Sequence, residues 1–146
     1  MLGQLDGASV LDLFAGSGAL GIEALSRGAH RAVFVERDAR AAAVLRENLD
    51  TLAIAPQLAE VRRADVRAAL HAARGGQETY DLVFIDPPYR HARDWGPELS
   101  AVLPALLAPA ARVVVESDRR SPLELPTEIE RQRRYGDTSI TIHRHQ

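Results

Sequence analysis

The sequence contains no cysteine and no lysine, and these absences limit what the chain can be. Without cysteine, disulfides and thiolate metal sites are excluded, and nothing points to an oxidising compartment. All 18 cationic side chains are arginine, which a coding bias explains as well as chemistry does. The first residues include no basic leader, and no apolar run is long enough for a signal peptide or a membrane span. We therefore expect a cytoplasmic protein.

The rest of the composition is that of an ordinary globular protein. The 146 residues are 46% hydrophobic and 26% charged, which predicts one domain over residues 1–146 with a sizeable core. The formal net charge is −2 and the pI is about 6.2. The chain as a whole should therefore not hold nucleic acid strongly by electrostatic attraction alone.

The succession of apolar segments predicts a Rossmann-like α/β fold. Strands are expected at residues 9–14, 31–36, 58–63, 80–85, 112–116, 128–135 and 138–143. Helices are expected at residues 19–25, 39–52, 66–73 and 97–107, with Pro104 kinking or ending the last one. Asp38 and Asp65 are the natural N-caps of the second and third helices. The pattern predicts a doubly wound, seven-stranded sheet with the short third strand at an edge and a terminal antiparallel hairpin.

A glycine-rich turn follows the first expected strand. Residues 16–21, GSGALG, match the G-x-G-x-x-G pattern between a strand and a helix, where glycines permit a tight turn close to a ligand. The pattern indicates a nucleoside cofactor but does not choose between NAD and S-adenosylmethionine. The alternative is a glycine turn without a ligand. Ser17 has no base partner in the sequence, and its position in this loop explains it without nucleophilic catalysis.

Three acids accompany this turn. Glu36 ends the second expected strand, where it can accept hydrogen bonds from ribose hydroxyls or simply be an exposed acid. Asp12 lies inside the first strand, where it needs a partner: either the ammonium of a cofactor or the glycine loop itself. Asp65 follows the third strand and can reach an adenine amino group or cap the next helix.

The segment 83–89, VFIDPPY, carries the clearest chemical signal. The apolar run predicts a buried parallel strand, and ligands of such sheets bind beyond the carboxyl ends of the strands. Pro87 and Pro88 stiffen the turn and remove two backbone donors, so Asp86 and the carbonyls become hydrogen-bond acceptors beside the Tyr89 ring. A planar amine, such as the exocyclic amine of a nucleobase, matches this arrangement. The alternative is a strand-ending turn with a capping acid and a core tyrosine.

Cationic side chains follow two of the expected strands. Arg90, His91 and Arg93 come after Tyr89, and residues 119–120 are both arginine. Guanidinium groups bind phosphate well, so a nucleic-acid backbone is one partner; a solvated arginine surface is the other interpretation. The remaining histidines, His30, His71, His143 and His145, show no metal-ligand spacing with carboxylates, and we assign no metal.

Four segments together resemble the RsmD family, which methylates N2 of a guanine in small-subunit (16S) ribosomal RNA. They are residues 10–29 (VLDLFAGSGALGIEALSRGA), 34–38 (FVERD), 81–89 (DLVFIDPPY) and 135–138 (YGDT). The resemblance covers essentially the whole chain and implies a class I methyltransferase fold with S-adenosyl-L-methionine as cofactor and S-adenosyl-L-homocysteine as product. It also implies small-subunit rRNA, or an assembling ribosomal subunit, as partner.

The resemblance also implies the roles of individual residues. The cofactor would contact Asp12 and the loop formed by Phe14, Ala15, Gly16, Ser17 and Gly18. Glu36 would bind its ribose, Arg37 would lie near the adenine face, and Asp65 with Val66 would lie at the adenine edge. Asp86, Pro87, Pro88 and Tyr89 would form the [D/N]-P-P-[Y/F] signature of amino-group methyltransferases.

One departure from the family concerns the N-terminus. Family members carry a segment before the first strand, with a basic hairpin and a helix that help close the cofactor pocket and hold RNA. Here the first strand is expected at residue 9, so this sequence would be a truncated or shortened relative. We expect weaker cofactor binding and altered RNA selectivity from that difference.

The mechanistic hypothesis is that a guanine leaves its stack and lies against Tyr89. Asp86 and the Pro87 carbonyl then accept the amine hydrogens, so that the nitrogen lone pair can attack the sulfonium methyl. Alternatives within the class are a DNA adenine-N6 or a protein glutamine methyltransferase. An NAD-dependent oxidoreductase and a non-catalytic remnant stay open as alternatives of other classes. A monomer is the default expectation for the oligomeric state.

Overall fold

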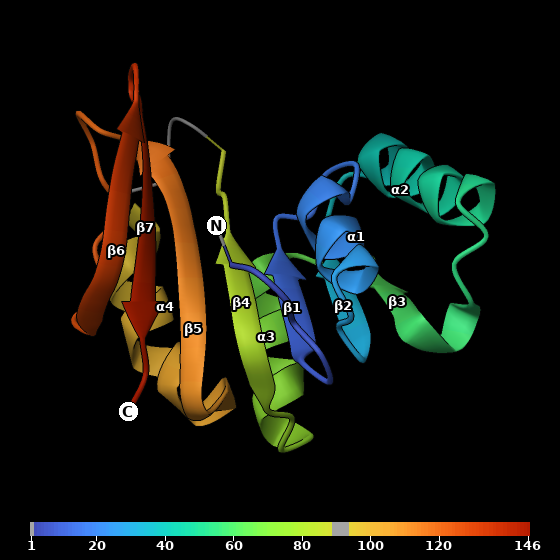
Figure 1. Ribbon diagram of the computed structural model, residues 1–146, viewed down its shortest axis with the longest axis horizontal. Helices are drawn as coiled ribbons and strands as arrows, with labels where there is room; N and C mark the ends of the chain where they lie inside the picture. Colours follow the sequence, from blue (N-terminus) through green and yellow to red (C-terminus); the bar gives the residue numbers. More distant parts are fainter. Residues whose placement is uncertain (1, 89–93) are drawn as a thin grey trace.

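The structure is a computed structural model that describes residues 2–88 and 94–146. It contains one seven-stranded sheet with helices on both faces (Figure 1). The strands are β1 (Ser9–Leu13), β2 (Arg31–Val35), β3 (Ala59–Arg62), β4 (Tyr80–Ile85), β5 (Leu107–Asp118), β6 (Glu128–Tyr135) and β7 (Thr138–Arg144). The helices are α1 (Ala19–Ser26), α2 (Ala39–Thr51), α3 (Val66–Gly75) and α4 (Trp95–Val102), with short 3-10 turns η1 (Pro56–Leu58) and η3 (Leu103–Leu106). The predicted doubly wound fold with its terminal hairpin is confirmed.

The strand order is β3-β2-β1-β4-β5-β7-β6. Strands β1 to β5 are parallel, whereas β7 runs antiparallel between β5 and β6. The third strand lies at one edge, as predicted, and β6 forms the other. Because the order reverses between β1 and β4, the carboxyl ends of these strands open a crevice at the switch point.

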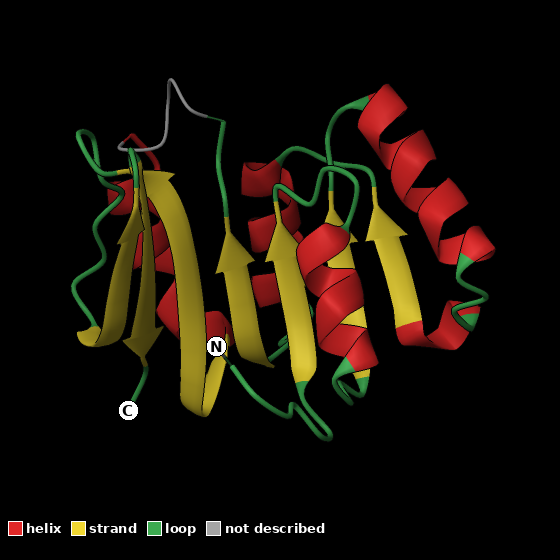
Figure 2. Ribbon diagram, turned by 45° about the horizontal axis from the view of Figure 1, so that its top comes forward, coloured by secondary structure: helices red, strands yellow, loops and turns green. Residues whose placement is uncertain are grey.

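Two hydrophobic cores lie on opposite faces of the sheet. Figure 2 shows helices on both of these faces. On one face, α1 and α2 pack over β1, β2 and β4, with Phe34 and Leu45 at the centre of the contact. On the other face, α3, α4 and η3 pack over β4, β1 and β5 through residues such as Leu70, Leu99 and Val113. Alternating side chains of β1, β2, β4 and β5 supply both cores, which explains the continuous apolar runs in these segments of the sequence.

Helix boundaries follow local signals. Asp38 and Asp65 cap α2 and α3, as predicted, by accepting hydrogen bonds from the backbone N–H groups of Ala41 and Arg67. After α1, the N–H groups of Gly28 and Ala29 donate to the carbonyls of Leu25 and Ala24. That pairing is a Schellman motif, and Gly28 adopts the left-handed conformation that the motif requires.

Helix α4 and strand β5 depart most from their predicted boundaries. Helix α4 begins two residues earlier than expected and ends at Val102, because Pro104 shifts the chain into the 3-10 turn η3. Strand β5 begins at Leu107 rather than Arg112, with an irregular register opposite residues 80–82 of β4. Within this extension, Ala110 has a positive φ of 64°, which lies outside the strand region. The apolar run at residues 112–116 therefore did not predict that the strand begins at Leu107. Within the described residues, no helix is both long and apolar enough to cross a lipid bilayer.

Candidate active site

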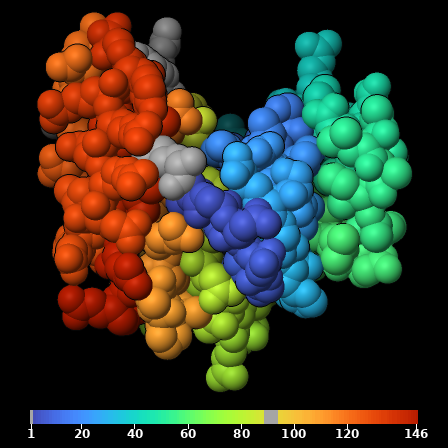
Figure 3. Space-filling model, in the orientation of Figure 1, coloured from blue at the N-terminus to red at the C-terminus, as the bar shows by residue number. Residues whose placement is uncertain are grey.

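A cavity of about 620 Å³ lies at the carboxyl ends of the parallel strands. Figure 3 shows the notch that this edge leaves between the C-terminal strands and the helices α1 and α2. Side chains from the ends of β1, β2, β3 and β4 and from the start of α4 line it: Phe14, Val35, Glu36, Arg37, Asp38, Asp65, Val66, Arg67, Asp86, Pro88, Asp94 and Trp95. Its volume is within the range of pockets that enclose a nucleoside-sized ligand.

Glu36 ties the glycine loop to the second strand. The N–H of Gly16 donates to Glu36 Oε1 at 2.8 Å, and the N–H of Asp38 donates to Glu36 Oε2 at 2.8 Å. Gly16 has a φ of +58°, a conformation that suits glycine, and it turns its N–H toward the acid. A carboxylate has about four acceptor sites, so roughly two of them stay available at the cavity wall.

Asp12 supports the loop from below. Its side chain is buried and accepts a hydrogen bond from the N–H of Gly21 in the first turn of α1, at 3.2 Å. Burial raises the pKa of Asp12 to about 7; the Gly21 N–H partly opposes this, and the charges of Asp86 and Glu36 add to it. The sequence left two partners open for Asp12, the ammonium of a cofactor and the glycine loop. The structure shows a hydrogen bond from Gly21, the last glycine of the GSGALG motif.

Gly21 lets helix α1 pack closely against the sheet. A Cβ atom at this position would lie 2.3 Å from Cε1 of Phe34 in β2. This third glycine of the motif therefore lets α1 approach the sheet closely. Phe14, by contrast, is a non-glycine residue with a φ of +58° at the end of β1. Such strained backbone persists only where the surrounding packing holds it, and it is common at functional sites.

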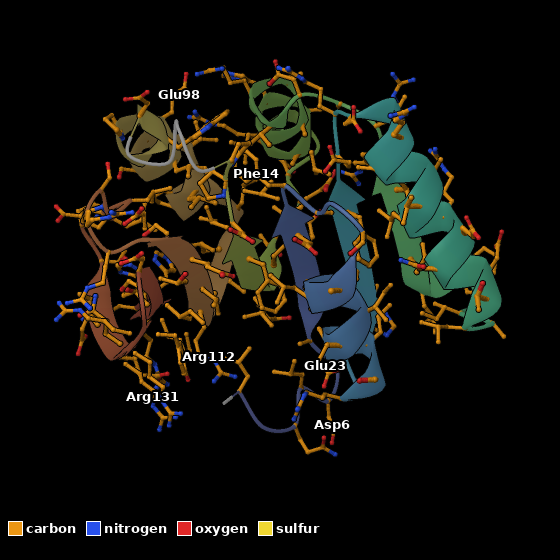
Figure 4. All side chains as sticks on the ribbon, turned by 90° about the horizontal axis from the view of Figure 1, so that it is seen from above. Asp6, Phe14, Glu23, Glu98, Arg112 and Arg131 are labelled. Carbon is orange, nitrogen blue, oxygen red and sulfur yellow. The ribbon has the colours of Figure 1, made fainter. Side chains whose placement is uncertain are left out.

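Two aromatic side chains line the cavity: Phe14, which the sequence indicated, and Trp95, which it did not. The rings of Phe14 and Trp95 meet edge to face with centroids 5.1 Å apart. The guanidinium of Arg67 lies 4.4 Å from the Trp95 ring centroid, and its Nε donates to Glu98 at 2.6 Å. Figure 4 shows Phe14 near the middle of this edge and Glu98 on the α4 side. The only tryptophan, at the first turn of a helix after the proline turn, was the available signal.

Asp86 directly follows β4 and lines the same cavity as Glu36, the acid that follows β2. Its side chain is exposed to the cavity, Pro87 is buried and Pro88 lines the cavity. Two effects raise the pKa of Asp86 to about 6. The larger is desolvation by partial burial, and the smaller is the charge of Glu116 on the adjacent strand β5. Glu116 is the second residue that the sequence analysis missed, because only strand pairing brings it beside Asp86. Tyr89, Arg90, His91 and Arg93 lie outside the described residues.

The predicted cofactor residues divide into two groups. Phe14, Glu36, Arg37, Asp65 and Val66 line the cavity together with Asp86. The others are not among the residues that line it: Asp12 lies in β1, and Ala15, Gly16, Ser17 and Gly18 form the loop after that strand. In this loop the carbonyl of Ser17 accepts a hydrogen bond from Asn48 Nδ2 at 3.0 Å. The capping role of Asp65 is present, with an N–H to Oδ1 distance of 2.6 Å, and the residue also faces the cavity.

The two arginines after β5 have protein partners. Arg119 Nη1 donates to the carbonyl of Gly136 in the hairpin turn at 3.1 Å. Arg120 Nη2 lies 3.1 Å from Asp118 Oδ2 and 3.9 Å from Asp137 Oδ2. Neither arginine lines the cavity of the acids. Their positions fit a role in holding the hairpin turn against the end of β5.

Four features together define a class I S-adenosylmethionine-dependent methyltransferase: the strand order, the glycine loop, the acid after β2 and the Asp-Pro-Pro turn after β4. Solved proteins of this fold hold S-adenosylhomocysteine, the product of that cofactor. The chain belongs to the RsmD family: residues 1–144 match the sequence profile of the family described as Conserved hypothetical protein 95.

Three similar proteins show how far the match extends. YlbH of Bacillus subtilis is 39% identical over 149 residues, covering 95% of this chain and 77% of YlbH. Ribosomal RNA small subunit methyltransferase D of Haemophilus influenzae is 38% identical over 117 residues, covering 80% of this chain and 60% of that protein. A solved Streptococcus pyogenes protein superimposes with a TM-score of 0.83 at 32% identity, covering 98% of this chain and 89% of that one. The chain thus spans less than two thirds of the H. influenzae relative.

Proposed function

We propose that this protein transfers a methyl group from S-adenosylmethionine to the exocyclic N2 amine of a guanine in small-subunit (16S) ribosomal RNA. The observation that carries the proposal is that Glu36 and Asp86, from separate strands, face one cavity. The name of the H. influenzae relative supports ribosomal RNA of the small subunit as the substrate. The partner is then that RNA or an assembling ribosomal subunit in the cytoplasm.

The donor set fits the cofactor. Glu36 keeps acceptor sites for two ribose hydroxyls after binding the backbone N–H groups of Gly16 and Asp38. Arg37 and Val66 offer flat and apolar surfaces for an adenine, and Asp65 offers an acceptor for its amino group. When bound, S-adenosylmethionine supplies an electrophilic methyl group on a sulfonium.

Asp86 would orient and deprotonate the target amine. Its carboxylate and the Pro87 carbonyl accept the two N–H hydrogens, which directs the nitrogen lone pair toward the methyl group. The bound cofactor would supply this methyl group, and its sulfur would keep the electron pair of the carbon–sulfur bond as the nitrogen–carbon bond formed. The methylated nitrogen then carries an extra proton, which the Asp86 carboxylate can accept and pass to water. Catalysis is therefore mainly positioning and charge placement, with Tyr89 proposed as the surface on which the base stacks.

Labelled methyl transfer tests this function. The protein is incubated with labelled S-adenosylmethionine and either unmodified small-subunit RNA or small-subunit particles, and the RNA is digested for nucleoside analysis. We expect label in N2-methylguanosine, and Asp86→Ala should lose on the order of 100-fold in rate because it removes an acceptor used mainly in the transition state. Asp50→Ala, an exposed acid on α2, is the matched control and should retain full activity.

Three results would contradict the proposal. Label in N6-methyladenosine would move the target to adenine, and label confined to added protein would move it to a glutamine amide. Near-normal turnover by Asp86→Ala would remove Asp86 from the mechanism. Comparing free RNA with particles in the same assay identifies the form of the substrate.

A further inference from the structure

The outer strand of the hairpin carries a cationic and aromatic surface away from the cavity. Arg131, Arg133 and Tyr135 alternate along β6 and therefore point to the same side of the sheet. Their cross-strand partners on β7 are Ile142, Ile140 and Thr138. We call the surface formed by Arg131, Arg133 and Tyr135 the arginine–tyrosine face.

This face lies on the α1 side of the sheet. Ile142 pairs with Val114 of β5, and Val114 packs against the core that α1 and α2 cover. Figure 4 places Arg131 and Arg112 on the same side as Glu23 of α1 and away from Glu98 of α4. In the part of the chain that the structure describes, no helix covers β5, β7 and β6 on this side (Figure 1).

No acid in the described part of the chain forms an ion pair with the two arginines of the arginine–tyrosine face. Among the described residues, neither Arg131 nor Arg133 has an ion pair or a side-chain hydrogen bond. Arg144, one strand away, is engaged by Glu130 at 3.1 Å. The Tyr135 side chain is 54% exposed although it is large and aromatic. Unpaired guanidinium groups next to an exposed ring are what a single-stranded nucleic acid requires, since phosphates bind the first and bases stack on the second.

The strand register shows how far this face lies from Asp86. Ile85, the residue before Asp86, pairs with Val115 of β5. The next residue of β5, Glu116, pairs with Ile140 of β7. Ile140 in turn pairs with Arg133 of β6. Arg133 therefore lies three strand spacings from Asp86, or about 14 Å at about 4.8 Å per strand. Glu116 lies between Arg133 and Asp86, and its negative charge repels phosphate from the site around Asp86. A strand of RNA would thus have its backbone over β6 and β7 while the target base reaches Asp86.

We propose that the arginine–tyrosine face binds single-stranded RNA flanking the target nucleotide. Arg131 and Arg133 contact successive phosphates, and one base stacks on Tyr135. This inference rests on the proposed function for its substrate, but it assigns a binding surface that is separate from the cavity. Addition of a protein strand to the β6 edge is disfavoured, because closely spaced arginines on an edge strand oppose such pairing.

The test measures RNA binding separately from cofactor binding. A fluorescently labelled, unmodified fragment of small-subunit rRNA is titrated by anisotropy with wild type, Arg131→Gln/Arg133→Gln and Tyr135→Ala at several salt concentrations. The exposed arginines can be replaced without opening the core, and S-adenosylhomocysteine affinity by calorimetry should stay unchanged. Arg134→Gln is the matched control, because Arg134 is on the same strand and faces a separate pocket with Gln132 and Thr141 on the other side.

The expected results follow from the number of contacts. Loss of two phosphate contacts should reduce the slope of log affinity against log salt by about 1.4, since each contact contributes about 0.7 on a single strand. Tyr135→Ala should weaken binding about tenfold, which corresponds to about 1.4 kcal/mol of base stacking. Methyl transfer by both variants should show a raised KM for RNA with kcat retained.

Each other outcome has a defined meaning. Wild-type RNA affinity and salt slope in Arg131→Gln/Arg133→Gln would overturn this inference, and if wild type methylates RNA the proposed function would still stand. An equal loss in Arg134→Gln would also overturn it, because binding would then depend on overall charge. If wild type transfers no methyl group to RNA but the double variant alone loses RNA binding, the face is supported and the proposed function fails.

Discussion

At the scale of single residues, Asp12 and Asp86 are two acids of the site whose pKa values are raised by their surroundings. Asp86 follows β4 and is influenced by the charge of Glu116 on the neighbouring strand β5, whereas Asp12 is buried in β1. Burial and like charge both favour the neutral form of a carboxyl group. Asp12 and Asp86 therefore titrate in a range where activity and stability can be measured.

Methyl transfer should depend on pH through Asp86. The carboxylate form accepts the amine hydrogens, and the pKa of Asp86 is raised to about 6, so kcat/KM should fall as pH decreases through about 6. Glu116→Gln removes the neighbouring charge and should move the midpoint to lower pH. Glu47→Gln, an exposed acid on α2, should leave the profile unchanged. A flat profile from pH 5 to 8 would contradict the proposed role of Asp86.

Folding stability should depend on pH through Asp12. Its folded pKa of about 7 is above the ordinary value of 3.8, so the folded state binds the proton more tightly and the free energy of unfolding falls as pH rises from about 4 to 7. Asp12→Asn keeps an acceptor for the Gly21 N–H and has no charge to bury. Relative to wild type, the variant should gain at most about 4 kcal/mol between these pH values, at 1.36 kcal/mol per pKa unit.

Urea unfolding at a series of pH values measures this difference. The two proteins should differ by a constant amount above about pH 8, where Asp12 is ionised in both states. A difference that is the same at pH 4 and pH 7 would show that the carboxyl group of Asp12 is not perturbed.

At the scale of elements, the loop after β1 is positioned by how closely α1 packs on the sheet. Gly21 contacts the ring of Phe34, and Asp12 holds the same turn by a hydrogen bond. The helix is short, with eight residues, so its position depends on tertiary contacts more than on helix propensity.

Gly21→Ala should therefore destabilise the protein although alanine is the better helix former. The added methyl group overlaps Phe34 Cε1, and overpacking of this kind costs typically about 1–3 kcal/mol. Chemical denaturation measures the change. Gly75→Ala is the control, since a Cβ there meets no atom within 4 Å, and it should be neutral or slightly stabilising. Equal effects at the two positions would show that packing against Phe34 does not matter.

At the scale of the whole molecule, the cavity exists because parallel strands end at one edge. Its walls come from residues 14 to 95, so a ligand there links the ends of β1, β2, β3 and β4. Such a ligand binds only the folded chain and must raise its apparent stability.

S-adenosylhomocysteine should raise the melting temperature, whereas NADH should not. At 100 times its dissociation constant a ligand stabilises by about 2.7 kcal/mol, which for a domain of this size is a shift of roughly 5–10 °C. Differential scanning fluorimetry with matched concentrations of the two nucleotides makes the comparison. Stabilisation by NADH alone would favour the oxidoreductase that the glycine motif leaves open.

Much of the fold could be predicted from local patterns. The strands, the caps at Asp38 and Asp65 and the final hairpin follow from apolar periodicity and turn residues, which act over a few positions. The extension of β5 to Leu107 was missed because alanine and proline residues there carry no strand pattern. The Phe14–Trp95–Arg67 contacts were missed because they join three separate elements.

The sequence by itself determined the fold class, the glycine loop and the Asp-Pro-Pro turn, because each depends on residues that are adjacent in the chain. Only the tertiary structure decided that Glu116 raises the pKa of Asp86, that Gly21 serves packing, and that Arg131, Arg133 and Tyr135 share one face of the sheet. Those relations depend on strand pairing and register, which bring together residues that no local pattern connects.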